Sequence, residues 1–348
     1  MAKKSITVGA LQMGGGAPVT IQSMTNTNTA DVEATRAQIA RLENAGCDIV
    51  RVAVPDTAAA RAIAALKETA QIPIVADIHF DYRLALEAVA AGADKIRLNP
   101  GNIGTAERVR DVARACRERG VPIRIGVNGG SLEREILARH GGVTPEALVE
   151  SALGHVRLLN QFDFDDICIS AKASDVRLTV LAYRLLAERT DYPLHLGVTE
   201  AGTEYMGLVK SAAGIGALLI DGIGDTVRIS LTAEPEREVR AALALLGALG
   251  LRKTGPEVIS CPTCGRTQIN LIGIANEVEK RLEGMKRPIT VAVMGCAVNG
   301  PGEASRADYG IAGGRGEGVL FKGGKVLRKV PMEQLVDALI DLIERDER

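Results

Sequence analysis

Short apolar runs alternate with longer amphipathic segments between about residues 19 and 250, and this alternation constrains the fold most strongly. Several amphipathic segments end at glycine, as at Gly46, Gly92 and Gly120, which is typical of helix C-termini. Eight strand–helix units predict a (β/α)8 barrel of the TIM type, with a doubly wound parallel sheet as the alternative. The predicted strands are Val19–Met24, Asp48–Val54, Pro73–His79, Lys95–Pro100, Pro122–Asn128, Asp166–Lys172, Leu194–Glu200 and Thr226–Ser230.

A segment with Lys, Gly and Pro at residues 251–256 interrupts this alternation and predicts a linker. We therefore assign residues 1–252 to the barrel and residues 253–348 to a second, smaller α/β domain. The expected elements of this domain are strands at Glu257–Ser260 and Ile289–Met294, helices at Gln268–Leu282 and Met332–Glu344, and a glycine-rich hairpin near Gly310–Lys325.

Charge and composition narrow the class of partner. The formal net charge is −1, and aromatic residues make up only 3% of the chain, with no tryptophan. Such a chain does not favour nucleic acid or an anionic membrane surface as a partner. Six cysteines among 348 residues do not resemble a secreted disulfide framework. No apolar run follows Lys3 and Lys4, so we expect no signal sequence, and no apolar stretch is long enough to predict a membrane span. We therefore expect a cytoplasmic protein without a nucleic-acid or membrane partner.

Polar side chains interrupt predicted strands that should be apolar on both faces. Within a strand these residues lie two or four positions apart, so they share a face that we expect to point into the barrel mouth. Four arginines and a lysine gathered there need an anion, and phosphate or diphosphate matches guanidinium geometry; the alternative is that each arginine pairs with a structural carboxylate. The set comprises Arg51, Asp77, His79, Arg97, Asn99, Arg124, Asn128, Lys172, Arg228 and Ser230, with Glu200 at the end of its strand.

Three cysteines near the C-terminus form a metal-site pattern. Cys261 and Cys264 are separated by two residues, and Cys296 lies in a later segment rich in glycine. A structural zinc site normally has a fourth Cys or His ligand, but no histidine follows His195. An iron–sulfur cluster with one differently ligated iron fits three thiolates better. Cys47, Cys116 and Cys168 are expected to be buried and to bind no metal.

With both features in view, the sequence resembles the family of bacterial 4-hydroxy-3-methylbut-2-en-1-yl diphosphate synthases, in its short two-domain form. The similarity runs nearly end to end and is most specific in the two cysteine segments. The motifs that carry it lie at residues 19–27, 76–80, 95–102, 126–132, 196–202, 261–264 and 294–303.

This resemblance implies a [4Fe–4S] cluster held by Cys261, Cys264 and Cys296, with Glu303 as the fourth ligand. It also implies reductive ring opening and dehydration of 2-C-methyl-D-erythritol 2,4-cyclodiphosphate to 4-hydroxy-3-methylbut-2-enyl diphosphate, in isoprenoid biosynthesis. A departing hydroxyl needs a proton, and by match to the family Glu200 is the candidate donor. His79 is expected to hydrogen-bond phosphate or to donate a proton.

The resemblance further implies a homodimer in which one chain's cluster domain covers the partner's barrel, and an electron donor that is either flavodoxin or ferredoxin. Two other functions remain open from the residues alone. The first is a non-redox barrel lyase or aldolase with a zinc-binding appendage, in which Lys172 forms a Schiff base. The second is a nucleic-acid-binding module with a zinc-ribbon-like tail, which the charge and composition disfavour.

Overall fold

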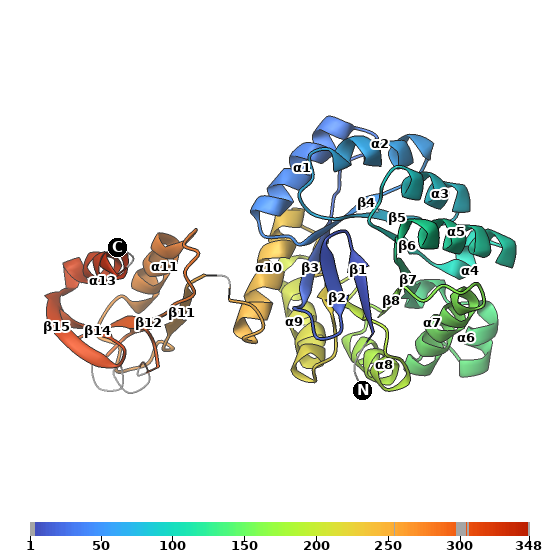
Figure 1. Cartoon of the computed structure of the whole chain (residues 1–348). Coiled ribbons are helices and arrows are strands. Elements are labelled where there is room, and N and C mark those ends of the chain that lie inside the picture. The colour runs from blue at the N-terminus through green and yellow to red at the C-terminus, as the bar shows by residue number, and fades with distance from the viewer. Residues whose placement is uncertain (1–3, 254, 297–303, 305, 347–348) are drawn as a thin grey trace. The chain divides into compact units, whose positions relative to one another are not determined.

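The computed structural model describes residues 4–253, 255–296, 304 and 306–346 (Figure 1). The chain divides into two compact units whose boundary falls between Arg252 and Lys253. None of the helices in these ranges is long and apolar enough to cross a membrane.

The first unit is a (β/α)8 barrel, which confirms the predicted fold class. Its eight parallel strands hydrogen-bond in the order β8-β7-β6-β5-β4-β3-β10-β9. Strands β8 and β9 are adjacent as well, because the Ile169 amide donates to the Pro193 carbonyl at 2.9 Å and Ile169 bridges to Leu194. The strands are β3 (Thr20–Met24), β4 (Ile49–Ala53), β5 (Ile74–Asp77), β6 (Lys95–Leu98), β7 (Ile123–Asn128), β8 (Ile167–Lys172), β9 (His195–Leu196) and β10 (Thr226–Val227).

Helices surround this sheet, and several begin with a side-chain cap just after a strand. Asp31, Asp56 and Asp175 each accept a hydrogen bond from a backbone amide three residues later. Such caps satisfy free amides at the helix N-terminus and fix the path of the loop that follows each strand. The helices are α1 (Val32–Asn44), α2 (Thr57–Lys67), α3 (Tyr82–Ala90), α4 (Pro100–Ile103), α5 (Ala106–Arg119), α6 (Arg134–His140), α7 (Pro145–Asn160), α8 (Val176–Arg189), α9 (Glu204–Ile220) and α10 (Pro235–Ala248).

An antiparallel hairpin precedes the barrel and was not predicted. It pairs β1 (Ser5–Val8) with β2 (Leu11–Gly14). Ile6, Val8 and Met13 of the hairpin pack in one buried cluster with side chains from the first residues of the barrel strands, such as Ile49. Figure 1 shows β1 and β2 lying across the centre of the barrel. The hairpin therefore covers the N-terminal end of the barrel interior.

The barrel strands are shorter than predicted, although all eight are present. Strand β5 ends at Asp77 and β6 at Leu98, so His79 and Asn99 lie in the connections that follow. Strands β9 and β10 end at Leu196 and Val227, well before Glu200 and Ser230. The polar residues at these positions therefore belong to loops on the C-terminal end of the barrel.

The second unit is a five-stranded sheet with its own core. Its strands lie in the order β11-β12-β13-β14-β15; β11, β12 and β13 are parallel, and the last two are antiparallel. Helices α11 and α13 pack on it with a separate buried cluster that includes Leu339 and Ile343. The elements are β11 (Glu257–Ser260), α11 (Leu271–Leu282), β12 (Thr290–Met294), β13 (Tyr309–Ala312), β14 (Glu317–Lys322), β15 (Lys325–Pro331) and α13 (Leu335–Arg345).

Candidate functional site

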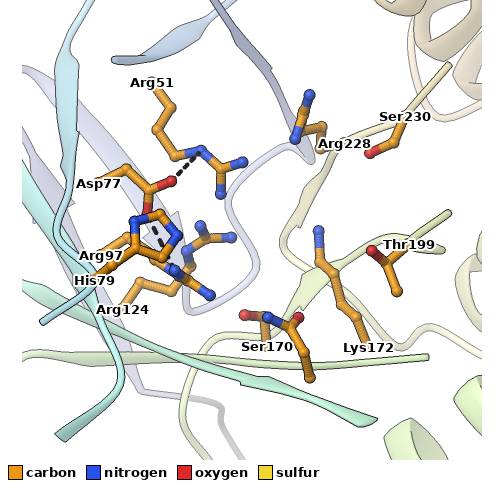
Figure 2. A pocket seen from close by; sticks show the side chains of 11 residues that line it. Arg51, Asp77, His79, Arg97, Arg124, Ser170, Lys172, Thr199, Arg228 and Ser230 are labelled. Atoms are coloured by element: carbon orange, nitrogen blue, oxygen red, sulfur yellow. Dashed lines mark hydrogen bonds and ion pairs between the residues drawn. The ribbon is translucent and has the colours of Figure 1, made fainter. Parts of the chain in front are cut away.

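A polar pocket with a volume of about 170 Å³ lies at the C-terminal end of the barrel (Figure 2). The C-terminal end is where (β/α)8 barrels carry their active sites, because the loops after the strands converge there. Five of the lining side chains are cationic and one is a carboxylate. The lining comprises Arg51, Asp77, His79, Arg97, Arg124, Asn128, Ser170, Lys172, Thr199, Arg228 and Ser230.

Asp77 is the carboxylate of the pocket and pairs with two arginines. Its oxygens lie 3.7 Å from Arg51 Nε and 3.2 Å from Arg97 Nη1, from the two strands that flank β5 (Figure 2). Burial alone would raise the pKa of Asp77, but Arg51 and Arg97 outweigh burial and lower it. Asp77 therefore stays ionised and neutralises part of the charge of these two guanidinium groups.

Arg124 and Lys172 are buried but form no ion pair within the described part of the chain. Burial, together with the neighbouring arginine Arg97, lowers the pKa of Arg124 to about 10. Burial also lowers the pKa of Lys172 well below its ordinary value, and the nearby arginines lower it further. A bound anion would stabilise the charged forms of both side chains, and the pocket between them provides space for one.

A glycine makes room for Lys172. A β-carbon at Gly197, in the connection after β9, would lie 2.5 Å from Lys172 Nζ and 2.8 Å from the Arg228 carbonyl oxygen. Real β-carbons do not approach other heavy atoms so closely, so a side chain here would displace the lysine. Gly197 thus allows the ammonium group to lie against the backbone of a neighbouring strand.

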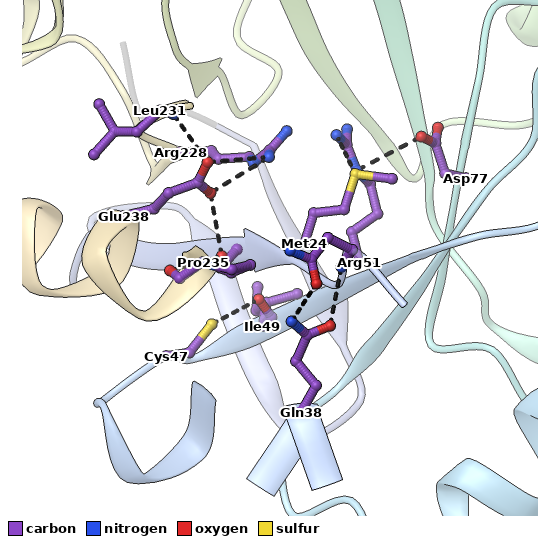
Figure 3. A network of polar contacts seen from close by, with 12 residues as sticks. Met24, Gln38, Cys47, Ile49, Arg51, Asp77, Arg228, Leu231, Pro235 and Glu238 are labelled. Carbon is purple, nitrogen blue, oxygen red and sulfur yellow. Dashed lines mark hydrogen bonds and ion pairs between the residues drawn. The ribbon is translucent and has the colours of Figure 1, made fainter. Parts of the chain in front are cut away.

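Arg51 has a second contact that orients its guanidinium group. Its Nε and Nη2 atoms lie 3.1 and 2.9 Å from the thioether sulfur of Met24, on the adjacent strand β3 (Figure 3). Thioether sulfur is a weak acceptor, so this contact guides the side chain without cancelling its charge. Arg51 therefore keeps most of its attraction for an anion.

Nine of the eleven residues predicted for the barrel site line this pocket, but two do not. Asn99 is buried, and its side chain accepts a hydrogen bond from the Gly101 amide at 3.1 Å, which caps α4. Glu200 is exposed, lies directly after Thr199 and has a positive φ of 53°, a conformation that is uncommon outside glycine. The roles predicted for Asn99 and Glu200 remain predictions.

Two lining residues were missed. Ser170 lies two positions before Lys172 on the same strand, so its spacing indicated the same inward face. Thr199 lies in a loop after β9, where strand periodicity no longer applies. The Ser170 hydroxyl donates to the Ile125 carbonyl at 3.2 Å, which leaves its oxygen as an acceptor in the pocket, and Thr199 adds a second hydroxyl.

Beneath the pocket the barrel interior is polar as well. Lys95, His195 and Thr226 are completely buried, and their polar side-chain atoms have no hydrogen-bond partner among the residues described. Burial lowers the pKa of Lys95 to about 8, and the positive charges of Arg124 and Arg51 contribute. Burial also lowers the pKa of His195 well below its ordinary value, and the positive charges of Arg124 and Lys172 contribute. This layer was missed, although Lys95 lies two residues before Arg97.

The three cysteines of the predicted metal site lie in the second unit. Cys261 directly follows β11, and Cys296 lies two residues after β12, the parallel neighbour of β11. The Gly295 amide donates to Cys261 Sγ at 3.2 Å, and amide donation of this kind stabilises a thiolate. Cys264 is exposed, and the backbone of Arg266 is the main cause that lowers its pKa.

The described residues contain no group of three His, Cys, Asp or Glu side chains arranged to hold a metal ion. Glu303, the predicted fourth ligand, lies outside the described residues. Three thiols on adjacent loops are nevertheless the donor type that iron–sulfur clusters require. The donor set fits such a cluster, with two of the thiols following the ends of neighbouring strands.

Two family models match the two units of the chain. The model described as the GcpE TIM-barrel domain matches residues 3–243, and the model of the GcpE protein C-terminal domain matches residues 257–345. The 4-hydroxy-3-methylbut-2-en-1-yl diphosphate synthase (flavodoxin) of Geobacter sulfurreducens is 60% identical over 342 residues, which cover 98% of this chain and 97% of that protein. The protein of the same name from Ruminiclostridium cellulolyticum is 59% identical over 337 residues, 97% of this chain and 96% of the relative.

Solved structures show a likeness confined to the barrel fold. Dihydropteroate synthase from Yersinia pestis has a TM-score of 0.50 at 14% identity, covering 71% of this chain and 97% of that chain. The 3-dehydroquinate dehydratase of Geobacillus kaustophilus has a TM-score of 0.50 at 16% identity, and the match covers 70% of this chain and 97% of that chain.

The fold and the pocket define a (β/α)8 barrel enzyme whose C-terminal end carries a pocket lined by basic side chains. Both units match one family, and the relatives above are close to 60% identical over nearly their whole length. The chain belongs to the GcpE family, that of the 4-hydroxy-3-methylbut-2-en-1-yl diphosphate synthases.

Proposed function

We propose that the chain binds 2-C-methyl-D-erythritol 2,4-cyclodiphosphate in the barrel pocket and converts it to 4-hydroxy-3-methylbut-2-enyl diphosphate. The reaction adds two electrons and two protons, breaks one bond between carbon and a diphosphate oxygen, and releases one water. The diphosphate remains on the product. Membership of the family supports this assignment, and it agrees with the chemistry of the pocket.

The observation that carries the proposal is the imbalance of charge in the pocket. Five cationic side chains surround a space of about 170 Å³ with one carboxylate among them. A cyclic diphosphate carries two negative charges, which would offset the cations that Asp77 leaves unpaired. The same cations stabilise the diphosphate end as it leaves its carbon atom, because negative charge builds up there in the transition state.

In this proposal, the neutral polar residues of the pocket orient the ring of the cyclic diphosphate substrate. Ser170, Thr199, Ser230 and Asn128 offer hydroxyl and amide groups to phosphate oxygens and to the hydroxyl groups of the substrate. Asn99 is proposed as a further substrate contact because it directly follows the strand that carries Arg97.

Glu200 remains our candidate for the donor that protonates the departing hydroxyl, because it adjoins the pocket residue Thr199. His79 lines the pocket and is a second candidate, as donor or as phosphate contact. Glu200→Gln should lower kcat strongly with little change in KM, whereas His79→Gln should change KM if it binds phosphate. An unchanged kcat in Glu200→Gln would remove Glu200 from this role.

A [4Fe–4S] cluster is proposed on Cys261, Cys264 and Cys296, with Glu303 as the fourth ligand. When bound, the cluster supplies the electrons of the reduction one at a time. A carboxylate is a weaker iron ligand than a thiolate and is displaced more easily. Iron–sulfur chemistry and the cysteine usage of the chain also support a cytoplasmic location.

Metal analysis of anaerobically purified protein tests the cluster. About four irons and four sulfides per chain are expected, together with their loss in Cys296→Ser. The matched control is Cys116→Ser, which changes a buried free cysteine of the barrel and should keep the full iron content. Zinc without sulfide in the unaltered protein would overturn the redox function and favour a zinc-bearing lyase.

Flavodoxin is the proposed electron donor, rather than ferredoxin, because the names of the relatives include it. We further propose a homodimer in which the cluster unit of one chain completes the barrel site of its partner. Mixing Arg124→Met with Cys296→Ser tests the shared site, because only a hybrid dimer combines an intact barrel with an intact cluster unit. Recovery of about a quarter of the wild-type turnover is expected for random exchange. No recovery after demonstrated subunit exchange would place each site within one chain.

A further inference from the structure

Glu238 is a carboxylate buried in the apolar face of a helix. It lies on α10, where Val239, Ala242 and Leu246 form the face that packs on the barrel, and it is only 5% exposed. A glutamate at such a position is costly unless its oxygens receive hydrogen bonds. The groups that donate hydrogen bonds to Glu238 therefore indicate its role.

Three groups donate to this carboxylate (Figure 3). Arg228 Nη2 lies 3.3 and 3.4 Å from its two oxygens, and the Leu231 amide donates to one of them at 3.0 Å. The Ser23 hydroxyl on β3 donates at 3.3 Å. One side chain from an outer helix thus connects two neighbouring strand ends.

Two of these contacts lead directly to the pocket. Arg228 lines it, and Ser230, whose carbonyl carbon is bonded to the Leu231 amide nitrogen, lines it too. Glu238 itself does not line the pocket. Its negative charge therefore holds Arg228 from behind, whereas Asp77 holds Arg51 and Arg97 from within the pocket.

We propose that Glu238 is a positioning residue, which holds Arg228 and the peptide after Ser230 in the geometry that binds the diphosphate. The inference rests on the proposed function only for the identity of the anion. The position of Glu238 separates two possible effects of its removal. Loss of positioning would weaken anion binding, whereas a mere change in the charge of the region would strengthen it, because the pocket would become more positive.

Calorimetric titration with pyrophosphate distinguishes the two effects. Glu238→Leu removes all three acceptor contacts and suits the apolar face of α10, and we expect pyrophosphate binding to weaken at least tenfold. Glu238→Gln keeps an oxygen for the Leu231 amide and should lose less affinity. The matched control is Glu236→Gln on the same helix, whose partner is the exposed Arg41 at 2.6 Å, and its affinity should not change.

A double-mutant cycle distinguishes an effect of Glu238 through Arg228 from a general structural effect. If Glu238 acts through Arg228, the effect of Glu238→Gln on pyrophosphate affinity should largely disappear in an Arg228→Met background. Equal losses in both backgrounds, or unchanged or tighter binding in Glu238→Leu, would overturn the inference. If circular dichroism melting shows that Glu238→Leu does not fold, the pyrophosphate affinity of Glu238→Gln alone tests the inference. Wild-type protein that binds pyrophosphate but does not convert the cyclic diphosphate would refute the proposed function and leave this inference intact.

Discussion

Gly126 on β7 lies directly against the guanidinium group of Arg97 on the neighbouring strand β6. A β-carbon at Gly126 would be 2.4 Å from Arg97 Nε and 2.9 Å from Nη2. Gly126→Ala should therefore displace Arg97 from Asp77 and from the pocket, at a cost of about 1–3 kcal/mol in stability. We expect pyrophosphate affinity to fall about tenfold, equivalent to 1.4 kcal/mol, in calorimetric titration.

Gly154→Ala is the control for this substitution. Gly154 lies within helix α7, and apart from its chain neighbours and the nearby helix backbone, the nearest described atom to a β-carbon there would be Arg157 Nη2 at 3.8 Å. Alanine should stabilise the helix by up to about 1 kcal/mol and leave pyrophosphate binding unchanged. Wild-type affinity in Gly126→Ala would show that Arg97 adapts and that the small residue is not required.

Asp77→Asn should destabilise the protein when no anion is bound. The change leaves Arg51 and Arg97 without their carboxylate in a buried site, which costs about 3 kcal/mol. Pyrophosphate should restore part of this loss, so the melting temperature of the variant should rise more on pyrophosphate addition than that of the wild type. Asp221→Asn, which breaks the exposed pair with Arg184, should cost less than about 1 kcal/mol. Equal responses of both variants to pyrophosphate would contradict the assignment of Asp77.

Lys95→Met should stabilise the pyrophosphate-free protein at neutral pH. Burial lowers the pKa of Lys95 from 10.5 to about 8, so below pH 8 the folded state carries an unfavourable charge that the unfolded state solvates. The shift corresponds to about 3 kcal/mol. Between pH 8 and 10.5 the unfolded state binds more protons than the folded state, so wild-type stability rises with pH and the advantage of the variant disappears.

Denaturant unfolding of Lys95→Met at pH 7 and pH 10 tests this linkage. Lys210→Met, on the outer helix α9, is the control and should show no such dependence on pH. A variant that is less stable than the wild type at pH 7 would mean that Lys95 has a favourable partner inside the barrel.

Met24→Leu should weaken anion binding slightly. Leucine preserves the volume, so stability should fall by less than about 1.5 kcal/mol, but Arg51 loses the sulfur that orients it. We expect about a threefold loss of pyrophosphate affinity, consistent with a weak hydrogen bond. Met206→Leu, at an exposed position on α9, should leave the affinity unchanged. A loss of the same size in both variants would argue against the role of Met24.

The sequence predicted the barrel well because each strand carries a clear apolar pattern between capped helices. All eight predicted strands are present, and three of the polar pairs line one pocket, as the even spacing within each pair indicated: Asp77 with His79, Arg124 with Asn128, and Arg228 with Ser230. The hairpin at Ser5–Gly14 was missed because each of its strands has only four residues, too few for a periodic signal.

The less accurate predictions concern residues beyond the strand ends. Alternation determines the face of a side chain only while the backbone stays extended, and it no longer applies at Asn99, which begins a helical turn, or at Glu200, where φ is positive. Both depend on local loop conformations that sequence spacing does not encode. The interior layer with Lys95 and His195 was overlooked for a different reason, because burial of charge so deep in a barrel contradicts the ordinary pattern.

In the described part of the chain, the N-terminal hairpin leaves only one end of the barrel open to solvent. Ile6, Val8 and Met13 cover the end of the barrel opposite the pocket, so exchange with solvent takes place on the loop side. In the proposed function, the product diphosphate would then leave by the route through which the next substrate enters. Pyrophosphate and related anions should therefore compete with substrate, and high product concentrations should slow turnover by occupying the same passage.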